Sequence, residues 1–179
     1  MRQLSIKVCG PQFGEPGLFT GALQRLTGAE LQLKTLGEAD EVLEAVLPDF
    51  SGSIVTVSAV KQPLFFAERS YAMHIADADG IIYLLAGARS FSWLNDQDFE
   101  LFYRLYKQQA EPIPVVVLLN DMWCGGFSGD LLSLEDVSSF AKFGLPVVRT
   151  QIGHGCQEGL WEALETVLAL RDSSVDGVK

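Results

Sequence analysis

Cysteine, histidine and basic residues are scarce in this sequence of 179 residues. Three cysteines are too few and too scattered for a disulfide framework. With two histidines in the chain, a closed zinc site at His154 and Cys156 would need distant cysteines as well, so we expect no metal. The 13 basic and 23 acidic residues give a formal net charge of −10. Such an acidic chain is repelled by phosphates, which disfavours nucleic acid and anionic membranes as partners.

Long hydrophobic runs are also missing. No apolar stretch reaches the roughly 18 residues of a membrane span, and the N-terminus has no apolar segment of signal-peptide length. The composition, 48% hydrophobic and 20% charged, is typical of a folded domain and excludes global disorder. We expect a cytoplasmic protein without membrane insertion, folded as one domain over residues 1–171, with a flexible C-terminal tail at 172–179.

Strand-like apolar runs alternate along the chain with helix-like amphipathic stretches. The expected strands are Leu4–Cys9, Leu31–Leu36, Ser53–Val60, Ile81–Ala86, Ile113–Leu119 and Pro146–Thr150. The expected helices are Leu18–Thr27, Glu38–Leu47, Pro63–Ala76, Asn95–Gln109 with Asn95 as its cap, Leu134–Phe143 and Glu158–Leu170.

This alternation predicts an α/β fold of three layers, a mostly parallel six-stranded sheet with helices on both faces. The orientation of Leu31–Leu36 stays open: it is antiparallel, or a crossover helix joins it to Ser53–Val60. Ligands of such sheets bind beyond the carboxyl ends of the strands. The loops expected to carry a site are therefore 10–17, 59–64, 87–95, 120–130 and 151–157.

The loop after the first strand departs from a working phosphate loop. That motif, G-x-x-x-x-G-K-[ST], wraps backbone N–H groups around phosphates, places lysine on them and supplies a hydroxyl to magnesium. Gly10 is in place, but Glu15, Pro16 and Gly17 stand at the second glycine, the lysine and the hydroxyl. If Gly14 is aligned as the second glycine instead, Glu15 replaces the lysine. Two like charges about 4 Å apart repel by about 4 kcal/mol at a dielectric of 20, so we expect no ordinary triphosphate binding. The other interpretation is an ordinary glycine-rich turn.

From about Ile6 to Leu170 the chain resembles the Ras-like small GTPases, P-loop NTPases, and most nearly their bacterial gliding-motility branch. IKVCGPQFG stands at the family's phosphate loop, and IVTVSAV at the strand that leads into switch II. ADADGIIYLLAGARS resembles the family's A-D-G-V-V-F-V-x-D-S strand, and IPVVVLLND the strand that ends in the guanine-reading N-K-x-D. GLPVVRTQIGHGCQEGLWEALETVL resembles the last strand, the S-A-x loop and the closing helix. The similarity lies in the order and spacing of these segments.

Residues on which the family's chemistry depends differ here. The switch II stretch reads Ser58–Val60, with neither an acid nor a glycine. The base-recognition loop keeps Asn120, but Asp121 stands at the lysine and Trp123 at the base-reading aspartate. Phosphoryl transfer rests on positioning and charge stabilisation, which these groups supply in the family. The resemblance therefore implies a pseudo-GTPase without a cofactor. GTP and Mg²⁺ are expected only if the protein is a divergent switch.

Three apolar and aromatic groups are candidates for contact with a protein. Aromatic residues and arginine are enriched at interface hot spots. The candidate interface residues are Phe65, Phe66, Arg89, Phe91, Trp93, Trp123 and Phe127. Arg89, Phe91 and Trp93 are expected in one loop, and Trp123 and Phe127 in a second loop at the same sheet edge.

The sequence thus predicts a non-catalytic pseudo-GTPase that serves as an interaction or scaffold subunit of a cytoplasmic assembly. Without γ-phosphate contacts, such a domain holds one conformation instead of switching. The resemblance implies a protein partner of the roadblock type, or a place in a polarity, pilus or secretion assembly. Two alternatives stay open: a GTP-binding switch protein with an atypical phosphate loop, and a small-ligand enzyme on a flavodoxin-like frame.

Overall fold

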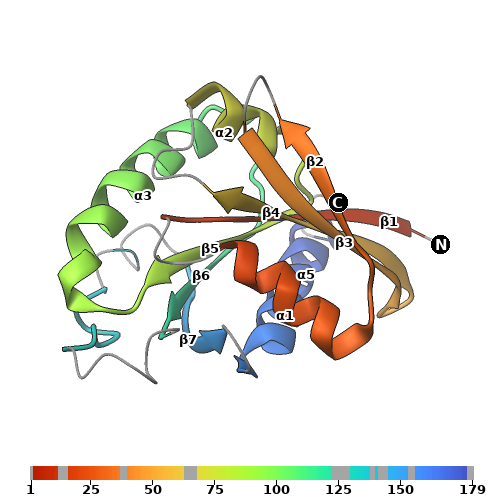
Figure 1. Cartoon of the computed structure of the whole chain (residues 1–179). Helices are drawn as coiled ribbons and strands as arrows, with labels where there is room; N and C mark the ends of the chain where they lie inside the picture. The colour runs from red at the N-terminus through yellow and green to blue at the C-terminus, as the bar shows by residue number, and fades with distance from the viewer. Residues whose placement is uncertain are drawn as a thin grey trace.

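The computed structural model describes residues 2–11, 16–36, 40–62, 68–121, 130–137, 140, 145–152 and 156–176. In this part of the chain, helices lie on both faces of one sheet (Figure 1). The strands are β1 (Arg2–Cys9), β2 (Leu31–Leu36), β3 (Asp40–Phe50), β4 (Ser53–Gln62), β5 (Gly80–Ala86), β6 (Val115–Asn120), β7 (Val147–Ile152) and β8 (Gln157–Glu158). The helices are α1 (Pro16–Thr27), α2 (Glu68–Ala76), α3 (Ser92–Tyr106) and α5 (Leu160–Asp176), and η2 (Arg89–Phe91) is a 3-10 turn.

The sheet is parallel in its centre and antiparallel at its margins. Its strand order is β2-β3-β4-β1-β5-β6-β7-β8. Neighbours from β4 to β7 run parallel, whereas β2, β3 and β4 form an antiparallel meander and β8 pairs antiparallel with β7. The predicted α/β class and the mostly parallel sheet are confirmed. The predicted number of six strands is wrong, because the described sheet has eight.

The sequence-based assignment of 38–47 as a helix is wrong, since Asp40–Phe50 forms β3. Ser51 and Gly52 have positive φ angles of 51° and 76°, which is the backbone of a two-residue hairpin turn. Phe50 pairs with Ser53 across this turn, so the turn folds β3 back on β4. The pairing energy of two neighbouring strands exceeds the helix preference of the Glu-, Leu- and Ala-rich segment. Leu31–Leu36 is antiparallel to β3, which settles the orientation left open above.

Helix boundaries also differ from the predicted ones. Helix α1 begins at Pro16 instead of Leu18, and α5 continues to Asp176 instead of ending at Leu170. Helix α3 begins at Ser92, so Asn95 is not its cap. The buried Asn95 side chain accepts the Ala86 N–H at 2.8 Å and donates to the Ala86 carbonyl at 2.9 Å. Asn95 therefore fastens the first turn of α3 to the end of β5.

Two hydrophobic clusters pack on opposite faces of the sheet. One lies under α1 and α5 and contains Phe19 and Leu164, and the other lies under α2 and α3 and contains Tyr71 and Phe102. Strands β5 and β6 are buried along their whole length, as their continuous apolar runs predict for strands covered on both sides. The carboxyl ends of β5 and β6 are therefore fixed within the buried sheet.

Candidate functional site

The carboxyl ends of neighbouring parallel strands bring several predicted loops together. Gly10 follows β1, Gly87 follows β5 and Asp121 follows β6. The Gly87 N–H donates to the Asn120 carbonyl at 2.9 Å, and the Asp121 N–H donates to the Thr150 carbonyl of β7 at 2.9 Å. Backbone hydrogen bonds thus continue past the strand ends, where ligands of open α/β sheets bind.

The described part of the first loop is shaped by packing. Gly10 has φ 142°, and a Cβ there would lie 2.1 Å from the Leu84 carbonyl oxygen of β5. Pro16 and Gly17 belong to the first turn of α1, where proline fits because its N–H would have no helical partner. The Thr20 hydroxyl donates to the Gly17 carbonyl at 3.0 Å. Gly14 and Glu15 lie outside the described residues, so the expected charge repulsion stays a prediction.

Asn120, the asparagine of the predicted base-recognition loop, is fully buried. Its amide nitrogen donates to the Ile152 carbonyl at 2.9 Å. Its amide oxygen accepts the Ile152 N–H at 2.8 Å and the Thr150 hydroxyl at 3.3 Å. Both ends of the side chain are therefore occupied in joining β6 to β7.

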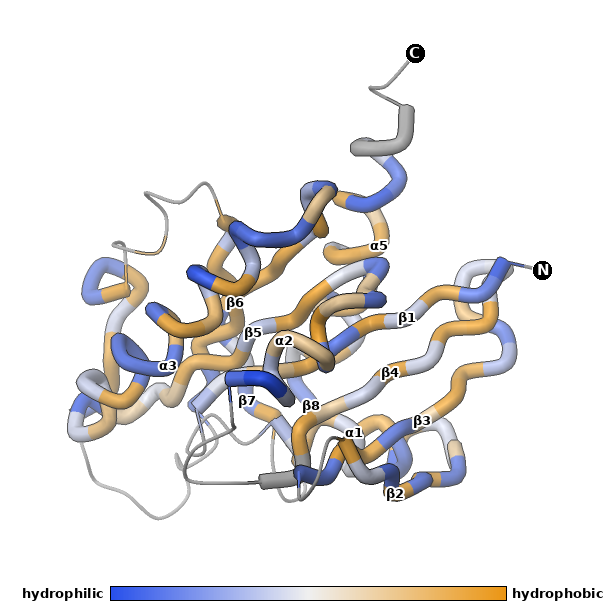
Figure 2. Tube along the Cα trace, turned by 90° about the horizontal axis from the view of Figure 1, so that it is seen from above, coloured by the Kyte–Doolittle hydropathy of each residue, from blue (hydrophilic) through white to orange (hydrophobic). Residues whose placement is uncertain are grey.

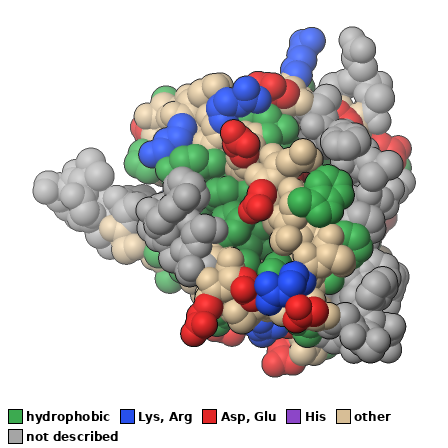
Figure 3. Space-filling view, turned by 90° about the vertical axis from the view of Figure 1, so that its left-hand side faces the viewer, with side chains coloured by type: hydrophobic (Ala, Val, Ile, Leu, Met, Phe, Trp, Pro, Cys, Tyr) green, Lys and Arg blue, Asp and Glu red, His purple; other side chains and the backbone are tan. Residues whose placement is uncertain are grey.

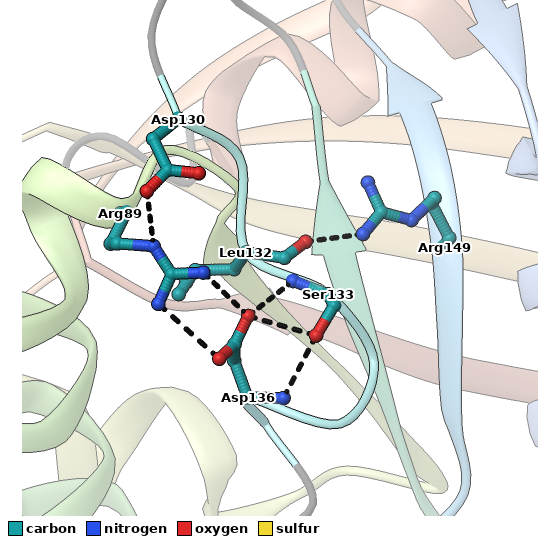
Figure 4. Close-up of polar contacts among 6 residues, drawn as sticks. All are labelled: Arg89, Asp130, Leu132, Ser133, Asp136 and Arg149. Carbon is teal, nitrogen blue, oxygen red and sulfur yellow. Dashed lines mark hydrogen bonds and ion pairs between the residues drawn. The ribbon is translucent and has the colours of Figure 1, made fainter.

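Asp121 is buried as well and forms an ion pair with Arg149 of β7. Arg149 also donates to the Leu132 carbonyl, which ties the segment after residue 130 to the same strand (Figure 4). The second carboxylate oxygen, Oδ1, has no hydrogen-bond partner among the described residues. The absence of a side chain at Gly87 makes room for it, since a Cβ there would lie 2.3 Å from Oδ1. Sequence reasoning missed Arg149; a lone cation in an otherwise uncharged strand was the available signal.

Arg89 is held by two carboxylates of the same chain. Its guanidinium donates to Asp130 at 2.7 Å and to both oxygens of Asp136, at 2.8 and 3.2 Å. Ser133 adds its N–H and hydroxyl to Asp136, at 2.7 and 2.8 Å (Figure 4). Hydrogen bonding to Arg89, followed by that to Ser133, holds the pKa of Asp136 well below its usual range. Arg89 thus links η2 to the segment 130–136.

Trp93 is the described candidate with the most exposed side chain. It lies in the first turn of α3 and not in a loop, and it is 57% exposed. Phe91, in η2, is half-buried. Figure 3 shows the side of the molecule that carries α3, where hydrophobic side chains reach the surface among acidic and basic ones. The candidates outside the described residues are Phe65, Phe66, Trp123 and Phe127.

A buried polar cluster under α2 and α3 was not foreseen. The hydroxyls of Tyr71 and Tyr83 both donate to Oδ2 of Asp98, at 3.1 and 2.7 Å. Burial raises the pKa of Asp98, although both hydroxyls act in the opposite direction. Burial also raises the pKa values of the two tyrosines and of the neighbouring Cys9. The spacing of these residues along the chain gives no sequence signal for the cluster.

His74 of α2 is 2% exposed. Its Nε2 lies 3.2 Å from the Val8 carbonyl oxygen. Burial, aided by the charge of Lys7, lowers the pKa of His74 to about 4. The ring is therefore neutral at pH 7 and acts as part of the packing between α2 and β1.

The described residues contain no group of three or more histidine, cysteine, aspartate or glutamate side chains arranged to hold a metal ion. Within the same part of the chain, no helix has both the length and the apolar character required to cross a membrane. No protein-family model matches the sequence, and no curated protein matches it either.

Proposed function

We propose that this protein is a degenerate Ras-like domain that works through protein contacts and not through nucleotide turnover. The observation that carries the proposal is the engagement of the predicted base-recognition residues within the fold. Asn120 uses both ends of its amide on β7, and Asp121 is neutralised by Arg149. A residue that reads a base must offer donors or acceptors to it, and here both ends of the Asn120 amide and one oxygen of the Asp121 carboxylate are already engaged within the protein.

The topology supports the same proposal. The resemblance implies a P-loop NTPase-like sheet with an antiparallel strand before the one that leads into switch II. Strand β3 runs antiparallel to β4, and Ser58–Val60 lies in β4 itself. The Ser58 hydroxyl donates to Glu44 at 2.9 Å and so belongs to the sheet. On this proposal, one fixed surface that includes Trp93 contacts the partner, of roadblock type or from a polarity, pilus or secretion assembly.

The nucleotide part is tested by isothermal titration of the protein with GTP and with GDP, each with Mg²⁺. We expect only heats of dilution, so that any Kd is weaker than about 10 μM. An active small GTPase under the same conditions is the positive control. Saturable binding below that value, or guanine nucleotide carried through purification, would favour the divergent switch protein and refute the proposal.

The contact surface is tested by truncating Trp93. A buried tryptophan at an interface hot spot contributes about 2 kcal/mol or more, so Trp93→Ala should weaken capture of the partner by about 30-fold. Met73→Ala is the matched control, because Met73 is 46% exposed on α2. Quantitative capture from the native source should lose a specific protein with the first variant and keep it with the second. Equal recovery with both variants would exclude Trp93 from the interface.

A further inference from the structure

We propose that two copies of this chain pair through their β2 strands and so join their sheets into one. Strand β2 is the first strand in the sheet order, and Figure 2 shows it at the rim beyond β3. All six of its residues pair with β3 on one side, and no described strand pairs with its other side. The unpaired N–H and C=O groups of an edge strand form a template for another strand.

This edge has few of the features by which proteins block edge pairing. Proline, β-bulges and charged side chains are the usual devices. Strand β2 reads LQLKTL, without proline, and its pairing with β3 is regular, while the register shifts lie between β3 and β4. The single charged residue, Lys34, forms an ion pair with Glu44 of β3. That ion pair draws the ammonium over the sheet and away from the free edge.

The side chains of β2 match a second copy of the same strand. In an antiparallel pair related by a two-fold axis at Leu33, the two Leu33 side chains face each other, and Leu31 faces Thr35 of the second copy. Leu33 is 52% exposed, so this contact would remove apolar surface from water. On the other face of the sheet, Gln32 would lie opposite Lys34 of the second copy, a pairing without like charges. An axis at Lys34 would instead oppose two ammonium groups, which disfavours that register.

The absence of acidic residues from β2 matters because the chain as a whole is acidic. The net charge of −10 repels a second copy at long range, and salt screens this repulsion. Within β2 itself no carboxylate opposes the approach. Pairing should therefore strengthen as the salt concentration rises, which is the reverse of what contact between opposite charges would give.

Sedimentation of the full chain at increasing concentration tests the pairing. We expect a monomer–dimer equilibrium between about 1 and 200 μM that shifts toward the dimer in higher salt. Leu33→Lys opposes two charges at the axis and should weaken dimerisation at least about tenfold. Leu134→Lys is the control, since Leu134 is 48% exposed and lies far from β2 in the chain. A monomer at every concentration, or a dimer that resists Leu33→Lys, would overturn the proposal.

Cysteine cross-linking tests the register. Directly opposed residues of an antiparallel pair have Cα atoms about 4.5–5.5 Å apart, which is within reach of a disulfide. Leu33→Cys should thus give a disulfide-linked dimer under mild oxidation. Leu31→Cys should not, because its two copies would be about 13 Å apart along the strands. The parent chain with its three cysteines sets the background. Equal cross-linking of both variants, or no cross-linking of Leu33→Cys above the background of the parent chain, would contradict the pairing of two copies.

Discussion

Gly10→Ala is expected to destabilise the protein by about 3 kcal/mol or more. Two physical effects add at this position. The φ angle of 142° is one that residues with a side chain rarely adopt. A Cβ would also lie 2.1 Å from the Leu84 carbonyl oxygen, and this backbone atom belongs to a strand buried along its whole length. The clash can be relieved only by moving β1 away from β5.

Urea denaturation of matched glycine variants separates the two effects. Gly28→Ala meets no atom within 4 Å and has φ 71°, so it reports backbone strain alone, about 1 kcal/mol. Gly21→Ala lies inside α1 with the Arg25 guanidinium 3.7 Å away, and it should stabilise by about 0.5–1 kcal/mol. A loss below 1 kcal/mol for Gly10→Ala would show that β1 and β5 tolerate separation.

Gly10 opens the loop that resembles a phosphate loop. A glycine directly after the first strand is one of the features on which the resemblance to phosphate loops rests. The packing of β1 on β5 requires glycine there whether or not a nucleotide binds. Gly10 therefore carries little information about phosphate binding, and Glu15 is the residue of this loop that bears on it.

The sequence predicted the buried centre of the sheet better than its margin. Continuous apolar runs, as in β5 and β6, occur where both faces of a strand are covered. Such a run predicts a buried strand without any information about the strands that pair with it. Strand β3 is different, because its residues have helical preference and become a strand through pairing with β2 and β4. The local signal for this hairpin was the Ser51-Gly52 pair, whose positive φ angles form a two-residue turn. A sequence ending in such a turn indicates a strand before it and not a helix.

Side-chain partners distant in sequence could not be predicted. Asn95 has the residue type of a helix cap, but its amide is used by the end of β5. Arg89 has the residue type of an interface hot spot, and the structure gives it two carboxylates from a segment about 40 residues away. Asn120 was predicted as a site residue from its motif, which stays a prediction, whereas placing Arg149 beside Asp121 required the strand order of the folded sheet.

Asp98→Ala is expected to destabilise the protein by about 2 kcal/mol, through the hydroxyls of Tyr71 and Tyr83. Both tyrosines are fully buried, and both donate to the same carboxylate oxygen. Without the carboxylate, the Tyr83 hydroxyl loses its acceptor at 2.7 Å, and the Tyr71 hydroxyl loses its bond to the same oxygen. Asp98→Asn keeps an acceptor oxygen and should lose less than half as much. Because Tyr83→Phe removes the donor, the double variant with Asp98→Ala should recover part of the loss, a coupling that a cavity alone would not produce.

The pH dependence of unfolding gives an independent test of Asp98. Burial raises the pKa of this carboxyl in the native state, so the native state binds the proton more tightly than the unfolded chain. Its contribution to the free energy of unfolding must therefore increase as the pH falls from neutrality through the raised pKa, and level off below the ordinary value of 3.8. As the pH falls over this range, the parent should therefore gain stability relative to Asp98→Asn. A difference that is independent of pH would mean that the carboxyl is solvated.

The Asp98 cluster also bears on the proposal of a fixed conformation. Tyr71 belongs to α2, Tyr83 to β5 and Asp98 to α3, so a single carboxylate holds both helices to the central sheet. Helix α2 follows the stretch that would be switch II in a Ras-like domain, and a movable switch would need this helix free to shift. Amide hydrogen exchange should find α2 protected in the parent and exchanging faster in Asp98→Ala, with β6 unchanged. Fast exchange of α2 already in the parent would contradict a permanently held surface.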